Sequence, residues 1–316
     1  MNQTAPSTLF RISAGFVYLS INSFGLLAYS FVIMALVKYR QSFSHSFYGL
    51  LKCLAAADIG YMSTNMLVAV PQTFLGKQIY GNKLEVFLSA GNPLFYVSLV
   101  LSSFAICVDR FSCFIFPRVN SLFFDYPRMY LVICFCWTVS VLILICVEIL
   151  IDCPNKFDTS SLRYMYMCSN GANFKYLLLL FQFTKTLLIV MVVLYTAIFV
   201  YVKFHNRNSV GVQSTAGTEA RSRASNELKI LIQGCLICAM LWLEDFSFWF
   251  LPLIVTSNYA AVLTMFVGGL NCAINPIIYF CFSTVMRKNI LKLFNYVHLS
   301  DLNAAVSVRA NTWAPD

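Results

Sequence analysis

Charged residues are scarce in this sequence. Of its 316 residues, 11% are charged and 59% are hydrophobic, and the mean hydropathy is +0.73. A water-soluble globule carries about 25% charged residues, because its surface must be solvated. The composition therefore excludes a soluble fold, a disordered chain and a collagen-like repeat. The net charge of +9 does not indicate a nucleic-acid partner, because the basic residues fall in short segments between apolar runs.

Long apolar runs make up most of the chain. There are seven of them, near 12–37, 46–70, 84–108, 129–151, 176–202, 228–254 and 260–282. About 20 apolar residues in a helix cross a hydrocarbon core about 30 Å thick. A transmembrane β-barrel would need segments of about ten residues that alternate apolar with polar, and the sequence lacks them. We therefore expect an all-α membrane protein, a seven-transmembrane helix bundle.

The basic residues predict the orientation of the bundle. Fifteen of the 22 Lys and Arg residues fall beside one set of alternate loops, and seven fall beside the other. Basic residues are retained on the cytoplasmic side of a membrane. We expect a multi-pass protein of the plasma membrane with its N-terminus outside and its C-terminus inside. The only N-x-[ST] sequon begins at Asn2 in the N-terminal tail and predicts a glycan there.

A short amphipathic helix is expected after the last span. Apolar residues recur there at helical spacing, at Met286, Ile290, Leu293, Phe294 and Val297, with Arg287, Lys288 and Lys292 between them. These charges argue against a continuation of the span and favour a helix on the membrane surface. The expected organisation is an extracellular tail over 1–11, a seven-helix domain over 12–282, the surface helix over 283–298 and a cytoplasmic tail over 299–316.

Two of the 12 cysteines lie in a predicted extracellular loop. Most cysteines lie in spans, where a thiol behaves as a small hydrophobe. Cys153 and Cys168 lie in a predicted extracellular loop, an oxidising environment that favours a disulfide. The alternative is two free thiols.

Asp58 lies midway along the second predicted span. An ionisable group at that depth costs about 2.5–3.5 kcal/mol by insertion scales. Asn22 in the first span, and Asn271 and Asn275 in the seventh, are amides at a similar depth that can satisfy it. These four residues predict a buried polar cluster able to hold water or a small cation. The alternative is interhelical hydrogen bonding without a switching role.

Two short motifs lie near the predicted cytoplasmic ends of spans. Asp109 and Arg110 end the third span, either as a functional pair or as an interfacial pair with a snorkelling arginine. Pro276 follows Asn275 in the seventh span and predicts a kink, with Tyr279 one turn further on. Pro252 predicts a second kink in the sixth span.

Three more charged residues lie inside predicted spans: Lys185, Glu244 and Asp245. Exposure of a carboxylate to lipid is costly, so we expect at least one of the two acids to face the bundle interior. Together with Asp58, these residues leave open a transporter or channel with an ion path. Transporters usually contain internal repeats, and the sequence has none. We do not expect an enzyme, because the three histidines lie at or beyond span ends.

The order of these motifs resembles the rhodopsin-like (class A) family of G-protein-coupled receptors, over about residues 12–298. The divergence also resembles nematode serpentine chemoreceptors, although those often lose the final motif that is intact here. The resemblance implies an activation switch made of Asp109, Arg110, Phe246, Phe250, Pro252, Asn275, Pro276 and Tyr279. It implies that Arg110 is held by its neighbouring acid at rest and released toward the G protein. It also implies a sodium site at Asp58.

The sequence departs from the family pattern at several positions. Glu85 stands where the family usually has a bridging cysteine, which leaves Cys153 and Cys168 as a pair within one loop. Leu187 replaces the proline of the fifth helix. The aromatic toggle is Phe250 in place of tryptophan, and Trp249, one position earlier, is expected to face elsewhere on the helix.

The resemblance also implies an extracellular ligand pocket between the helices. Its expected lining is Asn92, Tyr96, Phe250, Leu253, Ile254, Met265 and Gly269. Asn92 occupies the position at which amine receptors carry an aspartate, so a biogenic amine is not expected, and a lipid, small molecule or peptide remains. For each lining residue, plain helix packing is the alternative. The expected function is a receptor that binds this ligand and activates a heterotrimeric G protein, without a cofactor other than the possible sodium ion.

Overall fold

The described part of the chain contains seven helices that can span a membrane. The computed structural model describes residues 6–39, 46–209, 218–255 and 258–293. Within these ranges the helices that are long and apolar enough to cross a membrane are Thr8–Lys38, Phe47–Leu75, Asn82–Ile115, Met129–Leu150, Gly171–Phe204, Leu231–Trp249 and Asn258–Phe282. The predicted all-α, seven-helix fold is confirmed. Asn2 and the tail over 299–316 lie outside the described residues.

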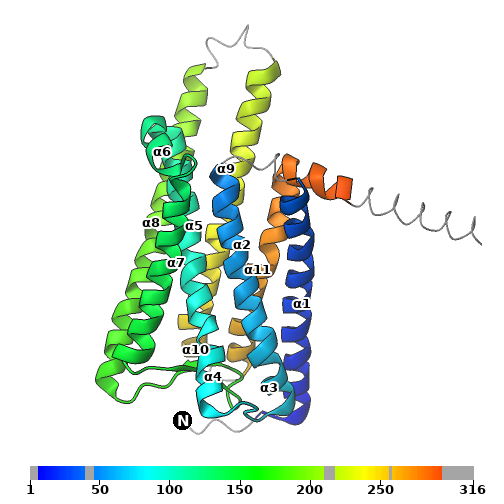
Figure 1. The fold of residues 1–316 in the computed structure, drawn as a ribbon, viewed down its shortest axis with the longest axis vertical. Helices are drawn as coiled ribbons and strands as arrows, with labels where there is room; N and C mark the ends of the chain where they lie inside the picture. Colours follow the sequence, from blue (N-terminus) through cyan, green and yellow to red (C-terminus); the bar gives the residue numbers. More distant parts are fainter. Residues whose placement is uncertain (1–5, 40–45, 210–217, 256–257, 294–316) are drawn as a thin grey trace, which may run out of the picture.

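The spans are assembled from helices and one short hairpin (Figure 1). In chain order these are α1 (Thr8–Lys38), α2 (Ser46–Thr64), η2 (Asn65–Ala69), α3 (Val70–Leu75), α4 (Asn82–Ser89), α5 (Gly91–Ile115), α6 (Pro117–Phe124), α7 (Met129–Ile145), η3 (Cys146–Leu150), β1 (Asn155–Asp158), β2 (Arg163–Tyr166), α8 (Gly171–Ser209), α9 (Thr218–Trp249), α10 (Leu251–Ile254) and α11 (Asn258–Phe282).

The bundle has two ends of different construction. The N-terminus, α3 and α4 lie at one end, and β1 packs against α4 there, so we call it the hairpin end (Figure 1). The opposite end carries α6 and, beyond Ser283, a helix over 284–293 that turns away from α11. We call it the Arg110 end, because Arg110 lies near that end of α5. In the 284–293 helix, Met286, Ile290 and Leu293 are buried while Arg287 and Lys288 are exposed, which is the predicted amphipathic pattern. Phe294 and Val297 lie outside the described residues.

Proline and glycine set the ends of two spans. The second span runs five residues beyond its predicted end, because Pro71 falls in the first turn of α3, where a missing N–H is tolerated. It stops at Gly76, whose φ of 64° ends the helix in the left-handed conformation. In the sixth span, α9 ends at Trp249 and α10 begins at Leu251, with Pro252 in its first turn. This break is the kink that the proline predicts.

The β-hairpin was not anticipated by the sequence analysis, which predicted only a loop there. β1 and β2 pair antiparallel, with Asn155 opposite Tyr166 and Asp158 opposite Arg163. A disulfide between Cys153 and Cys168 closes the base of the hairpin. At its tip, the Leu162 carbonyl accepts a hydrogen bond of 2.9 Å from the Tyr18 hydroxyl of α1. The hairpin is therefore seated in the bundle and does not extend away from it.

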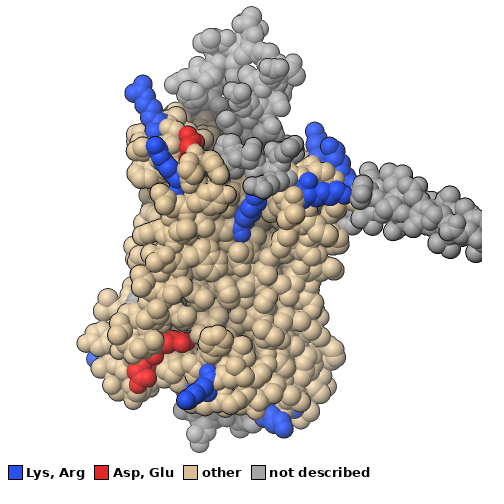
Figure 2. Space-filling view, viewed as in Figure 1, with Lys and Arg blue, Asp and Glu red and all other residues tan. Residues whose placement is uncertain are grey.

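The outer surface of the bundle is apolar between its ends. Figure 2 shows a broad uncharged band on the face in view, with Lys and Arg residues gathered toward both ends. Large hydrophobic side chains are exposed on the spans, among them Leu131, Leu179 and Val193 at 61–71%. Exposure of such a large apolar surface to water is unfavourable, whereas the hydrocarbon core of a lipid bilayer solvates it. The chain is a multi-pass membrane protein.

Candidate functional site

Asp58 is the centre of a polar cluster between three helices. It is fully buried on α2, and its Oδ2 accepts hydrogen bonds from the Tyr29 hydroxyl of α1 and from Asn275 Nδ2 of α11, the latter at 2.9 Å. A buried carboxylate needs such donors, because it has left its hydration behind. The cluster therefore ties α1, α2 and α11 together at mid-membrane depth.

Two of the amides predicted for this cluster are bonded elsewhere. Asn22 donates to the Tyr18 carbonyl at 2.7 Å and accepts from Asn65 at 3.3 Å. Asn271 donates to Glu244 at 2.6 Å. Neither hydrogen-bonds Asp58, so the prediction was wrong for both. Asn22 lies at a different depth along α1 from Tyr29, the residue of that helix that bonds Asp58. The two are about two helical turns apart, roughly 10 Å along the axis.

The Asp58 cluster offers oxygen atoms to a small cation. Among the described residues, Asp58 Oδ1, Asn275 Oδ1 and the Tyr279 hydroxyl are buried without a hydrogen-bond partner. Hard cations such as sodium prefer carboxylate and carbonyl oxygens of this kind. Asp58 and Asn275 therefore fit the expected ion chemically. The described residues contain no group of three or more His, Cys, Asp or Glu side chains suited to another metal.

Arg110 is held at the opposite end of the bundle. Its Nη2 lies 3.0 Å from Asp109 Oδ2, and its guanidinium carbon lies 4.2 Å from the centroid of the Phe47 ring. Asn120 of α6 donates to Asp109 Oδ1 at 3.1 Å, so the acid is itself oriented. Arg110 is 7% exposed. The arginine is thus paired with its neighbour and covered, and is not free at the surface.

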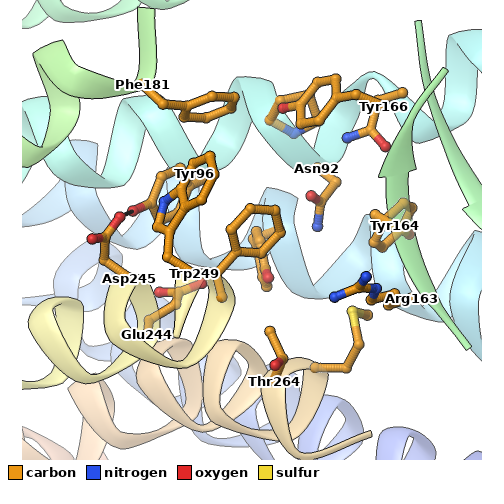
Figure 3. Close-up of a pocket in the computed structure, with 15 residues that line it drawn as sticks. Asn92, Tyr96, Arg163, Tyr164, Tyr166, Phe181, Glu244, Asp245, Trp249 and Thr264 are labelled. Carbon is orange, nitrogen blue, oxygen red and sulfur yellow. Dashed lines mark hydrogen bonds between the residues drawn. The ribbon is translucent and has the colours of Figure 1, made fainter. Parts of the chain in front are cut away.

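A cavity lies between the helices at the hairpin end (Figure 3). Its volume is about 680 Å³, counting the part that is open to solvent. The residues that line it are Tyr61, Asn92, Pro93, Tyr96, Asn155, Arg163, Tyr164, Tyr166, Phe181, Glu244, Asp245, Phe248, Trp249, Thr264 and Met265.

The predicted ligand pocket is partly displaced. Asn92, Tyr96 and Met265 line the cavity. Gly269 lies outside it, facing α1: a Cβ built there would be 3.0 Å from Ile21. Ile254 is 71% exposed, and the side chains of Leu253 and Pro252 lie outside the described residues.

The phase of the sixth span differs from the expected one. Phe246 and Phe250 stack on each other at 5.0 Å between ring centroids, and they are 47% and 49% exposed. Trp249 lines the cavity instead, although its side chain was expected to face elsewhere on the helix. Successive residues on a helix point about 100° apart, so Trp249 and Phe250 face different directions. The prediction was wrong for Phe250 as a pocket residue, and neither phenylalanine points into the bundle.

Glu244 and Asp245 both face the bundle interior, as the cost of exposing them to lipid predicts. Besides the bond from Asn271, Glu244 approaches Gly268 of α11: a Cβ built there would be 3.0 Å from its Oε1. Asp245 accepts a hydrogen bond of 3.4 Å from the Tyr96 hydroxyl (Figure 3). The Lys185 ammonium lies 4.1 Å from the Trp249 ring centroid.

The hairpin supplies cavity residues that sequence reasoning missed. Arg163 reaches in from β2 on the side opposite Glu244 and Asp245 (Figure 3). Burial lowers the pKa of Arg163, and the nearby Asp158 opposes that shift. Burial raises the pKa of the Tyr164 hydroxyl. The sequence contains only a weak indication of this strand, the strand-forming tyrosines at alternate positions in Arg163–Tyr166. The surrounding loop contains no recognisable motif.

The fold of the chain is similar to that of rhodopsin. The crystal structure of squid rhodopsin is similar to it with a TM-score of 0.81 and 18% sequence identity, over 93% of this chain and 88% of that chain. At this identity the likeness shows the fold alone. No curated protein matches the sequence.

A family model identifies the chain further. The model of the serpentine type 7TM GPCR chemoreceptor Srx matches residues 19–294, and the chain belongs to this family. The resemblance to both rhodopsin-like receptors and serpentine chemoreceptors is confirmed. A family of receptors gives no support to the alternative of a transporter or channel that uses Asp58, Lys185, Glu244 and Asp245.

Proposed function

We propose that the protein binds a ligand in the cavity at the hairpin end and activates a heterotrimeric G protein at the Arg110 end. The observation that carries this proposal is the arrangement along one bundle: an accessible cavity at one end, and Arg110 held by Asp109 at the other. The proposed receptor has a resting and an active helix arrangement. A ligand shifts the equilibrium between them only if it binds one arrangement more tightly than the other. A ligand in the cavity can bind the two arrangements differently, because Trp249 and Asp245 lie on α9 next to its break.

The connection between the two ends runs through α11 in this proposal. Asn271 bonds Glu244 beside the cavity, and Asn275, one turn further, bonds Asp58. A movement of α9 against α11 therefore alters both hydrogen bonds. A sodium ion at Asp58 and Asn275 would stabilise the arrangement in which these oxygens stay together. The hairpin end is then extracellular, and the Arg110 end faces the cytoplasm of a cell whose plasma membrane holds the receptor.

The test measures nucleotide exchange on a panel of G proteins in membranes that contain the receptor. We expect receptor-dependent basal exchange, loss of that exchange to background in Arg110→Ala, and a changed level in Asp58→Asn. Arg118→Ala is the matched control, because Arg118 is exposed on α6 at the same end and should leave exchange unchanged. Equal exchange in the wild type, Arg110→Ala and Asp58→Asn would refute the proposal.

A further inference from the structure

The cavity at the hairpin end is rich in aromatic rings. Seven of its 15 lining residues are aromatic: Tyr61, Tyr96, Tyr164, Tyr166, Phe181, Phe248 and Trp249. The face of an aromatic ring attracts a cation within about 6 Å of its centroid. The ring of Trp249 already accepts one cation in this way, the ammonium of Lys185. The walls therefore suit a ligand that has both an apolar body and a positive charge.

Three ionisable side chains other than tyrosines line the cavity: Arg163, Glu244 and Asp245. Arg163 faces Asp158 across the hairpin, and Lys185 acts electrostatically on Asp245. Glu244 is 5% exposed and has a neutral partner, Asn271. Arg110 and Asp109 form an ion pair, but this pair lies at the other end of the bundle from the cavity. Glu244 is therefore a lining acid whose hydrogen-bond partner is neutral.

A second, independent feature also indicates a missing donor. Asn155 of β1 lines the cavity and is 1% exposed, and its Oδ1 has no hydrogen-bond partner. A buried acceptor without a donor is unfavourable, because it has lost its hydrogen bonds to water. A ligand that carries N–H groups would satisfy this oxygen as well as Glu244. A carboxylate ligand would satisfy neither, although it would meet Arg163 Nε, a buried donor on the hairpin side that has no partner among the described residues.

We propose that the cavity binds a small organic monocation, an arylalkyl ammonium, whose nitrogen pairs with Glu244 and whose body packs among the aromatic rings. This inference rests on the proposed function, because it names the ligand class of the same cavity. Asn92 stands where amine receptors carry an aspartate and supplies only an amide. The anion that replaces it comes from α9, on a different helix, so the absence of an acid at Asn92 does not exclude a cationic ligand.

The experiment uses three probes that share a phenyl body and differ in charge: 2-phenylethylamine, 2-phenylethanol and 3-phenylpropionate. The readout is the thermal unfolding midpoint of the purified receptor in lipid nanodiscs, with each probe at millimolar concentration. A ligand that binds the folded state raises this midpoint. We expect the ammonium to raise it most and the carboxylate least. In Glu244→Gln we expect ammonium affinity to fall at least about tenfold, because a charge-assisted hydrogen bond is lost.

Glu85→Gln is the matched control. Glu85 is a buried carboxylate on α4 that accepts a hydrogen bond of 2.5 Å from Gln72 and does not line the cavity. Ammonium binding should survive in this variant, and 2-phenylethanol should bind Glu244→Gln as it binds the wild type. A midpoint that ignores the charge of the probe, or that does not respond to the ammonium, would overturn the inference. Binding needs no G protein here, so ammonium binding without nucleotide exchange would count against the proposed function alone.

Discussion

At the scale of single residues, polar side chains in the bundle are paired by depth. Tyr29 and Asn275 approach Asp58 from two helices, whereas Asn22 and Asn271 lie in other layers and bond other partners. The amide at Asn22 was the more obvious partner by residue type. A tyrosine is easily taken for packing, because its ring buries well and its hydroxyl adds little to its hydropathy.

Tyr29→Phe tests the importance of this hydroxyl. We expect the folded state to lose about 1–3 kcal/mol, because a buried carboxylate loses a donor while the ring is kept. The measurement is the thermal unfolding midpoint in detergent or nanodiscs. Tyr130→Phe is the control, since Tyr130 is 51% exposed on α7. Equal midpoints for the two variants would contradict the role assigned to Tyr29.

At the scale of elements, the hairpin is the feature that shapes the cavity. Its base is closed by the disulfide between Cys153 and Cys168, and its tip is held by Tyr18. Its turn is organised by Asp158, which accepts hydrogen bonds from the backbone N–H groups of Ser160 and Ser161, both at 3.1 Å. An ordered turn keeps Arg163 in place over the cavity.

The turn predicts a dependence of stability on pH. Burial alone would raise the pKa of Asp158, but hydrogen bonds from Ser161 and Ser160 outweigh it and lower this pKa below the ordinary value of 3.8. The carboxylate therefore stabilises the folded hairpin above pH about 4, and this stability is lost as the pH falls through the lowered pKa. Hydrogen exchange of the 158–163 turn should accelerate on acidification in the wild type.

Asp158→Asn should remove most of this acid dependence and leave exchange faster at neutral pH. Asp125→Asn, at the exposed start of the loop before α7, is the control and should behave as the wild type. An unchanged acid dependence in Asp158→Asn would show that another group controls the turn.

At the scale of the whole molecule, the bundle combines an apolar belt with two chemically different ends. Arg110 and the basic 284–293 helix lie at one end, and the cavity and the hairpin lie at the other. The excess of basic residues beside one set of loops predicts that the Arg110 end faces the cytoplasm. The sequon at Asn2 belongs to the opposite tail.

Orientation is therefore a prediction that intact cells can test. An epitope tag before residue 1 should be labelled on unpermeabilised cells, whereas a tag after residue 316 should need permeabilisation. Asn2→Gln should abolish a glycosidase-sensitive mass difference, and Asn170→Gln, which removes an asparagine outside any sequon, should not. Labelling of the C-terminal tag on intact cells would reverse the proposed topology.

The sequence by itself determined the class of molecule. Seven apolar runs with few charges have no alternative to membrane-spanning helices, since every backbone amide in lipid must be paired within its own helix. Pro252 likewise determined that the sixth span breaks, and Cys153 and Cys168 were the only two cysteines in a predicted extracellular loop. These properties depend on composition and local backbone chemistry, which a sequence displays directly.

Only the tertiary structure decided which side chains meet. The choice of Trp249 over Phe250, and of Tyr29 over Asn22, depends on the rotation and height of each helix within the bundle. A shift of one residue turns a side chain by about 100° and an apolar sequence does not record it, because all faces of such a helix are similarly apolar. The hairpin over the cavity depends on contacts with α1 and α4, which lie far from it in the chain and which no local pattern encodes.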